Sequence, residues 1–295
     1  MTVGMSGFTR AGEAKAVPLA LVKQAKANPL KITLITGASL GNDLDKQLTE
    51  AGVLARRLPF QVDNTLRKAI NNGEVMFIDQ HLSETVEQMR NQQLKKPDVA
   101  IIEAVAITED GGIIPSTSVG NSASFAIFVF IVIIEINTNL SPAFEGLHDI
   151  YIPTYRPTRQ AIPLTQVDER IGTHAINIDP AKIVGIVINN EYHDSPSTVT
   201  LPDDETQGIA NHLINFFEQE VAQSRLPKNL GPLQAGIGSI ANAVLTGLKD
   251  SNFEDLVMYS EVLQDCTFEL IDAGKMKFAS GSSITLSAKY GEKVF

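Results

Sequence analysis

The sequence of 295 residues contains no tryptophan, one cysteine and fewer basic than acidic side chains. Because a single cysteine cannot form an intramolecular disulfide, a reducing compartment is favoured. We interpret this residue, Cys266, as a buried structural thiol. Lys and Arg number 24 against 34 Asp and Glu, so the net charge is −10. Nucleic-acid binding requires a basic surface, and this balance argues against it.

Long apolar runs are also scarce. The longest, Phe125 to Ile134, is too short for a membrane span of about 20 residues. Its β-branched and aromatic side chains favour a strand buried on both faces. The N-terminus shows no basic segment followed by a long apolar stretch, so no secretory signal is visible. We therefore expect no membrane partner and a cytoplasmic protein, or a mitochondrial one if the source is eukaryotic.

Short apolar runs alternate with helical patterns along most of the chain. Strands are expected at residues 3–7, 31–36, 74–79, 98–105, 179–188 and 256–259, and helices at 43–51, 82–92, 206–223 and 240–248. This alternation predicts an α/β protein with a parallel sheet covered by helices on both faces. We place the first domain at 1–225, a linker at Arg225 to Pro232, and the second domain at 226–295. Both chain ends are abrupt, so we expect the chain to be part of a longer whole.

Gly37-x-Ser39-x-Gly41 follows a predicted strand and precedes a predicted helix. This is the context of the nucleophile elbow of serine hydrolases, and Asp and His residues follow in the required chain order. The motif stands on about the second strand, without a glycine-rich oxyanion segment or an identifiable histidine. A tight turn that glycine permits explains it better.

Gly236-x-Gly238-x-x-Ala241 matches the dinucleotide-binding fingerprint, and Glu261 follows at the spacing of a ribose-binding acid. The fingerprint requires a strand directly before its first glycine. The residues at 230–234 include a proline and form no apolar run, so a nicotinamide cofactor is disfavoured. The five histidines lack metal-ligand spacing, and we expect no metal.

Glu261 itself follows the apolar stretch Leu256 to Tyr259 and precedes a helical pattern. A carboxylate at the carboxyl end of a strand occupies the position at which open α/β sheets carry their chemistry. The glycine loop at 236–238 precedes another helical pattern upstream. The sequence therefore predicts a site made of a glycine loop and a strand-end carboxylate.

Several longer motifs extend this pattern over nearly the whole chain. They are Ser6 to Pro18, Pro115 to Ser122, Glu145 to Tyr151, Ile162 to Gly172, Gly236 to Leu245, and Tyr259-Ser260-Glu261-Val262-Leu263-Gln264-Asp265. Together they resemble the acetyl-CoA hydrolase/transferase family, class I CoA-transferases that include succinyl-CoA:acetate enzymes. Members are longer than this chain, which resembles a form truncated at both ends. The resemblance implies an α/β fold with two open, mostly parallel sheets flanked by helices, in which the second domain is incomplete.

The resemblance implies CoA transfer between an acyl-CoA, such as acetyl- or succinyl-CoA, and a small carboxylate. Acetyl-CoA hydrolysis would be a side or main reaction. Glu261 would be the nucleophile and would carry a γ-glutamyl-CoA thioester. CoA, as the acyl-CoA substrate, would contact the loop that also supplies oxyanion donors: Gln234, Gly236, Ile237, Gly238, Ser239 and Ile240.

The same resemblance implies a carboxylate pocket and an oligomeric state. The pocket would be formed by Ser118, Gly120, Asn121, Glu145 and His148. The full-length form would be a homodimer. The alternative from another class is an inactive fragment or a CoA-binding subunit that needs a second chain.

Overall fold

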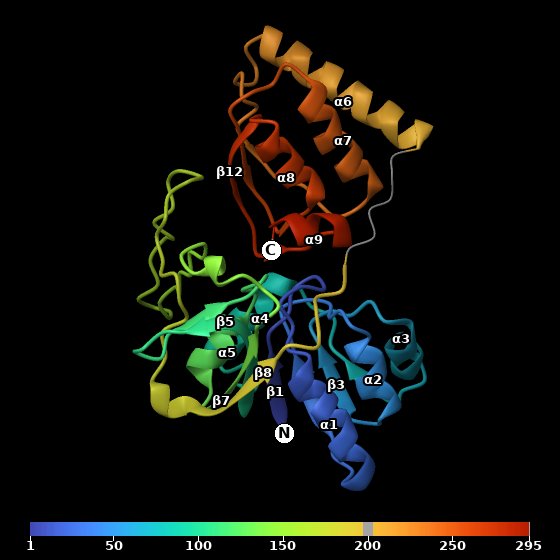
Figure 1. The fold of residues 1–295 in the computed structure, drawn as a ribbon, viewed down its shortest axis with the longest axis vertical. Coiled ribbons are helices and arrows are strands. Elements are labelled where there is room, and N and C mark those ends of the chain that lie inside the picture. The colour runs from blue at the N-terminus through green and yellow to red at the C-terminus, as the bar shows by residue number, and fades with distance from the viewer. Residues whose placement is uncertain (197–202, 295) are drawn as a thin grey trace. The chain divides into compact units, whose positions relative to one another are not determined.

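The computed structural model describes residues 1–196 and 203–294 (Figure 1). The chain forms two compact units, the first made of Met1–Pro163 and Ile171–Ser195, and the second of Leu164–Arg170 and the chain from Pro196 onward. We expected the boundary near residue 225, but helix α6 (Asp204–Ala222) belongs to the second unit. Its side chains Ile214, Phe217 and Val221 pack against that unit's core. The segment 225–232, predicted as a linker, therefore lies within the second unit.

The first unit contains one large sheet with the strand order β4-β3-β2-β1-β5-β7-β8, and all neighbours along this order are parallel. The strands are β1 (Thr2–Met5), β2 (Ile32–Ile35), β3 (Leu54–Leu58), β4 (Met76–Phe77), β5 (Val99–Ile107), β7 (Ile131–Asn137) and β8 (Ile183–Asn189). A short strand, β6 (Ile113–Pro115), pairs antiparallel with β5. The chain runs outward from β1 to β4 and then returns to the other side of β1, so the order reverses between β1 and β5.

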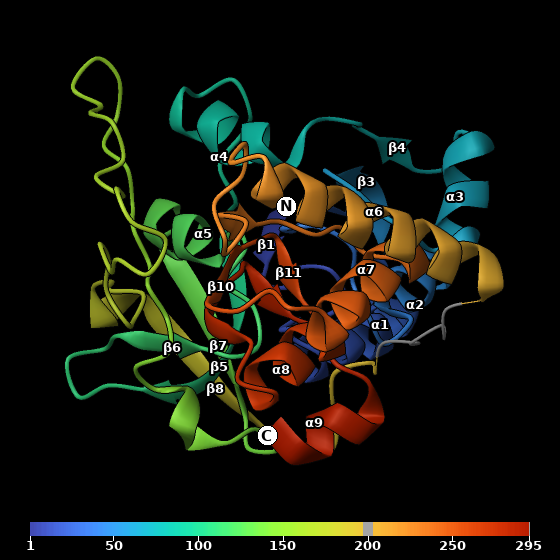
Figure 2. The same cartoon turned by 90° about the horizontal axis from the view of Figure 1, so that it is seen from above.

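Helices cover both faces of this sheet (Figure 2). They are α1 (Ala16–Ala27), α2 (Leu44–Glu50), α3 (Asn64–Asn71), α4 (Leu82–Arg90) and α5 (Ser122–Phe128), with short 3-10 turns at Pro142–Phe144 and Pro180–Lys182. Successive strand residues point to opposite faces. Leu34 accordingly packs in one cluster with α2 and α3, whereas Ile35 packs in another with α4 and α5. The predicted α/β class with a parallel sheet is confirmed.

The longest apolar run is not one strand, and that prediction was wrong. Residues up to Phe128 form α5, and β7 begins at Ile131. Phe125 is fully buried, and a Cβ at Gly4 of β1 would lie 2.7 Å from its ring carbon. The helix therefore packs closely on β1. Because both parts of the run are apolar, composition alone concealed the break, at which Phe130 is 89% exposed.

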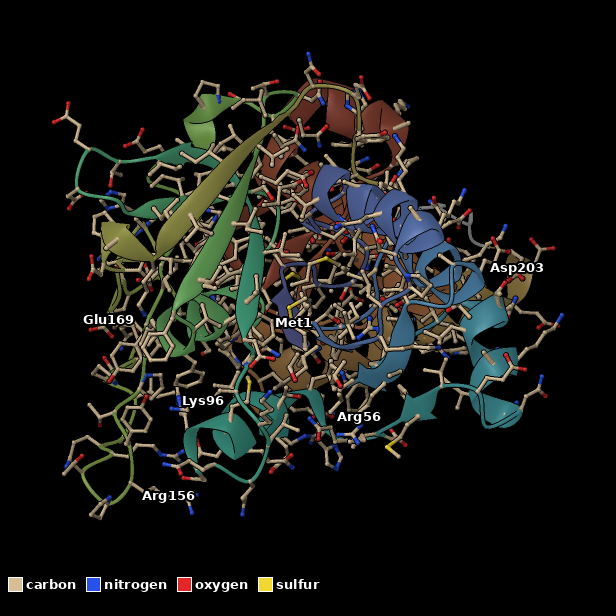
Figure 3. The ribbon with its side chains drawn as sticks, turned by 90° about the horizontal axis from the view of Figure 1, so that it is seen from below. Met1, Arg56, Lys96, Arg156, Glu169 and Asp203 are labelled. Atoms are coloured by element: carbon tan, nitrogen blue, oxygen red, sulfur yellow. The ribbon has the colours of Figure 1, made fainter. Side chains whose placement is uncertain are left out.

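Strand β8 stands at the end of the sheet order and alternates in exposure along its length. Val184, Ile186 and Ile188 are 62%, 55% and 61% exposed. Figure 3 shows β8 beside β7, with side chains projecting from the strand. Ile186 pairs with Ile134 of β7, which is fully buried. One row of branched side chains at this edge therefore faces solvent.

The second unit is a smaller α/β arrangement. Its parallel sheet has the order β12-β10-β9, made of β9 (Pro232–Leu233), β10 (Leu256–Tyr259) and β12 (Met276–Ser280). Two further strands, β11 (Val262–Leu263) and β13 (Ser283–Ile284), pair with each other. The remaining helices are α7 (Ser239–Asp250), α8 (Asp265–Asp272) and α9 (Ala288–Val294). Leu256, Met258 and Leu270 are fully buried in its core.

Candidate functional site

Glu261 lies between β10 and β11, and its side chain is exposed. Its backbone carbonyl accepts hydrogen bonds from the amides of Ser282 at 2.8 Å and Ser283 at 3.3 Å. These bonds attach the residue to the turn that follows β12. The main chain of Glu261 is therefore fixed while its side chain faces solvent.

The residues on either side of Glu261 hold the glycine loop. The hydroxyl of Ser260 lies 3.0 Å from the carbonyl oxygen of Ala235 and 3.3 Å from its amide nitrogen. On the other side, the side-chain amide of Gln264 donates to the carbonyl of Gly236 at 3.4 Å. The structure thus brings together the carboxylate segment and the loop that the sequence placed in one site.

The glycine loop itself is open. A Cβ built on Gly236 or Gly238 would meet no heavy atom within 4 Å. Gly238 has a φ of +137° and directly precedes α7, so a side chain there would strain the backbone. Gln234 and Ile237 are exposed, Ile240 is 48% exposed, and Ser239 is half-buried. A ligand can approach the backbone here from solvent, at a helix N-terminus that favours negative charge.

The prediction that no strand precedes the glycine loop was wrong. A two-residue strand, β9, does precede this loop and pairs in parallel with β10. A β9–loop–α7–β10 unit with Glu261 at its end therefore satisfies the local context of a dinucleotide fingerprint. The proline at position 232 concealed the strand, because proline is disfavoured within sheets.

The predicted pocket residues belong to the first unit, near the carboxyl ends of its strands. Ser118 is buried and donates to the carbonyl of Ala11 at 2.9 Å. Asn121 donates to the carbonyl of Thr36 at 3.2 Å. These bonds hold loops that follow β1 and β2. Gly120 has a φ of +47° and sits against the ring of Phe8.

The other two pocket candidates lie on a separate loop. A ring nitrogen of His148, Nε2, lies 3.1 Å from the carbonyl oxygen of Ser116. The imidazole stacks against Phe144 with ring centroids 6.3 Å apart. Glu145 is exposed. His148 therefore joins this loop to the segment that contains Ser118, whereas Glu145 remains in solvent.

The motif at Gly37 to Gly41 serves close packing. A Cβ at Gly37 would lie 2.8 Å from the carbonyl oxygen of Gly7, and one at Gly41 would lie 2.4 Å from a carboxyl oxygen of Glu13. Ser39 is only 5% exposed. The need for two glycines in a crowded turn accounts for the pattern.

Sequence reasoning missed a buried charge network in the first unit. The ammonium of Lys15 is fully buried and lies 2.6 Å from Glu103 and 2.7 Å from Asp194. Burial by itself would lower the pKa of Lys15, but these carboxylates raise that pKa above its ordinary value. Burial raises the pKa of Glu103 to about 8, and Ser116 donates to its other oxygen at 2.7 Å.

Two further carboxylates complete the network. Burial raises the pKa of Glu13 to about 7. Glu135 accepts from the amides of Lys15, Ala16 and Val17 at 2.8 to 3.0 Å, which caps the N-terminus of α1. A glutamate inside an apolar strand, as at positions 103 and 135, was the signal available in the sequence.

Comparison with solved structures defines the fold class. RipA from Yersinia pestis superposes with a TM-score of 0.69 at 16% identity, over 99% of this chain and 62% of that one. A 4-hydroxybutyrate CoA-transferase from Porphyromonas gingivalis superposes with a TM-score of 0.60 at 18% identity, over 100% and 60%. At these identities the likeness concerns the fold alone.

Sequence comparison then gives the family. Residues 1–188 match the profile of the acetyl-CoA hydrolase/transferase N-terminal domain. A succinyl-CoA:acetate CoA-transferase from Clostridium kluyveri is 44% identical over 289 residues, which are 97% of this chain and 54% of that protein. An acetyl-CoA hydrolase from Schizosaccharomyces pombe is 43% identical over 303 residues, 99% and 58% respectively. The chain belongs to the acetyl-CoA hydrolase/transferase family and spans little more than half the length of these relatives.

Within the residues that the structure describes, no helix is long and apolar enough to span a bilayer. The same part of the chain holds no cluster of three or more side chains suited to bind a metal ion.

Proposed function

We propose that this chain carries the nucleophile of a CoA-transferase, and that Glu261 is that nucleophile. The observation that supports it is the pair of tethers from Ser260 and Gln264 to the glycine loop, with the exposed carboxylate between them. Membership of the family makes an acyl-CoA and a small carboxylate the substrates we propose.

The reaction proceeds by exchange at carbonyl carbons. A carboxylate oxygen of Glu261 attacks the thioester carbon of the acyl-CoA, the C–S bond breaks, and CoA leaves as a thiolate. The thiolate attacks the glutamyl carbon of the mixed anhydride and releases the acyl group as a carboxylate. A second carboxylate reverses these steps and leaves as the new acyl-CoA. Attack by water instead gives hydrolysis.

Each attack forms a tetrahedral oxyanion that hydrogen-bond donors must stabilise. The backbone amides around Gly236 to Ser239 are the proposed donors, because no side chain shields the two glycines and the segment leads into α7. The covalent intermediate retains the thioester energy, which makes a weak carboxylate nucleophile sufficient.

The test traps the intermediate. The protein is incubated with acetyl-CoA, reduced with borohydride and digested, and the modified peptide is mapped by mass spectrometry. We expect reduction of the Glu261 side chain, and its loss in Glu261→Gln. Glu254→Gln serves as the matched control, since Glu254 is also exposed and lies in the same unit. Modification at another residue, or none, would contradict the proposal.

Nicotinamide binding is not favoured, because the chain belongs to the acetyl-CoA hydrolase/transferase family, although the β9–loop–α7–β10 geometry is compatible with it. Thermal unfolding separates CoA binding from nicotinamide binding, because a ligand that binds the folded state raises the melting temperature. CoA should raise it and NADH should not. A rise with NADH alone would favour the dinucleotide site.

A further inference from the structure

The segment just before the second unit crosses the carboxyl end of the first unit's sheet. Asp194 lies there, and its Oδ1 is 2.7 Å from the ammonium of Lys15. Its Oδ2 accepts from the hydroxyl of Thr117 at 2.5 Å. The amide of Gly12 lies 3.3 Å from both oxygens. One carboxylate therefore receives a buried cation, a hydroxyl and a backbone amide.

These donors come from parts of the chain that the sheet brings together. Gly12 and Lys15 follow β1, and Thr117 follows β6, which pairs with β5. The strand order reverses between β1 and β5, and such a switch point is where open α/β sheets bind ligands. Lys15 is fully buried, so its position is fixed by the surrounding protein.

The Asp194 carboxylate differs in its surroundings from a carboxylate that serves only as a structural ion-pair partner. Asp194 stands on an irregular segment, and its side chain is 18% exposed. In another buried pair of this unit, Arg57 bonds Asp45 at 2.8 Å, but Asp45 belongs to α2 and is only 3% exposed. The donors around Asp194 can thus be reached from solvent once that side chain moves.

A second acidic side chain, Glu13, lies next to the segment that carries Asp194. Glu13 is fully buried, and its Oε2 has no hydrogen-bond partner in the described part of the chain. Its Oε1 accepts from the side-chain amide of Asn42 at 3.0 Å. The Asn42 side chain also donates to the carbonyl of His193 at 3.0 Å, and its backbone amide donates to the hydroxyl of Ser195 at 2.7 Å. Residues on both sides of Asp194 are therefore bound at the same place.

We propose that Lys15, Thr117 and the Gly12 amide form a binding site for a small monocarboxylate, which the chain's own Asp194 occupies as an intramolecular ligand. An external carboxylate of the size of acetate would make the same bonds. Because Asn42 holds both His193 and Ser195, exchange of the ligand would free the Asp194 side chain while the segment stays attached. This inference stands on the first unit alone and does not depend on Glu261.

The test removes the internal ligand. Asp194→Ala vacates the position, and its melting temperature is measured with rising sodium acetate against sodium chloride at equal ionic strength. We expect a saturable, acetate-specific rise of at least about 3 °C in the variant. The wild type should show a smaller rise, because its own carboxylate fills the site. The double variant Asp194→Ala/Lys15→Met should lose the effect.

The matched control is Asp149→Ala. Asp149 accepts from the amides of Ile171 and Gly172 at 2.6 to 3.2 Å but forms no ion pair among the described residues. Acetate should not rescue it. If Asp194→Ala is unfolded in chloride, acetate must restore its circular-dichroism spectrum. An equal response of the wild type and Asp194→Ala to acetate, or no response of the variant, would overturn the proposal. Since no acyl-CoA is used, that outcome leaves the proposed function unaffected.

Discussion

Ser260 and Ala235 are joined by a two-way hydrogen bond in which one hydroxyl contacts both the carbonyl and the amide of a single residue. Ser260 directly precedes Glu261, and Ala235 directly precedes Gly236. The side chain is only 9% exposed, so water does not readily replace it. The position of the glycine loop relative to the carboxylate segment depends on this hydroxyl.

Ser260→Ala should therefore loosen the loop. We expect a loss of about 1 kcal/mol in the free energy of unfolding, the usual value for one buried hydrogen bond. Amide hydrogen exchange should speed up at residues 236–240, measured by mass spectrometry. Ser251→Ala is the control, because Ser251 donates to the carbonyl of Leu248 at 2.7 Å, away from the loop. Equal loop exchange in both variants would show that Ser260 does not position the loop.

Glu13 should give the protein a measurable pH dependence. Burial raises its pKa from 4.5 to about 7, so between these values the folded protein keeps a proton that the unfolded chain has released. Proton binding then stabilises the fold at acidic pH, and this contribution disappears as the pH rises through 7. Glu13→Gln removes this titration.

We accordingly expect the free energy of unfolding of Glu13→Gln, relative to wild type, to rise between about pH 5 and about pH 8. The change should be on the order of 1–3 kcal/mol by urea titration. Glu169→Gln is the control. The backbone amide of Thr165 lowers the pKa of Glu169, so that carboxyl is ionised in both states across this range. A pH-independent difference for Glu13→Gln would contradict the prediction.

Gly12 should tolerate no side chain. Its φ is +65°, and an added Cβ would lie 2.4 Å from the hydroxyl oxygen and 2.7 Å from the backbone nitrogen of Ser118. Gly52 has nearly the same φ, +67°, and open space around it. Gly52→Ala should cost about 1 kcal/mol for the left-handed conformation alone. Gly12→Ala should cost at least about 3 kcal/mol by urea unfolding, because backbone must also move; similar costs for both would refute the clash.

Cys266 should be unreactive in the folded protein. Burial raises the pKa of its thiol to about 11, and the residue is 6% exposed. Since the thiolate is the reactive form, reaction with Ellman's reagent near pH 8 should be at least about 100-fold slower than for a free thiol. The chain unfolded in guanidinium supplies the control, where the single thiol should titrate fully. Fast reaction in the native state would show that the thiol is accessible.

The sequence predicted most strands and helices because their apolar periods are local properties. It placed α6, α7 and β10 within a few residues of where they lie. It missed β9 and β11, two residues each, because such strands depend on pairing with distant segments rather than on their own composition. It also joined α5 to β7, because the break between them is as apolar as its flanks.

The candidate site was likewise predicted only in part from the sequence. The glycine loop and Glu261 were predicted together, since motif and spacing are readable along the chain, and the structure joins them through Ser260 and Gln264. The roles assigned to Glu261 and to the pocket residues stay predictions. Lys15 and Asp194 could not be paired in advance, because 178 intervening positions separate them and only the sheet order brings them together.

The row formed by Val184, Ile186 and Ile188 bears on how this chain behaves in solution. A long outer strand with branched apolar side chains and unpaired backbone groups is a template for adding another strand. Natural sheets usually protect such borders with lysine, proline or a bulge. The solvent-facing row of β8 carries neither lysine nor proline, although the pairing of β8 with β7 shifts register between Val132 and Ile133. This border is therefore open to intermolecular β-pairing, and the single substitution Ile186→Lys would oppose it.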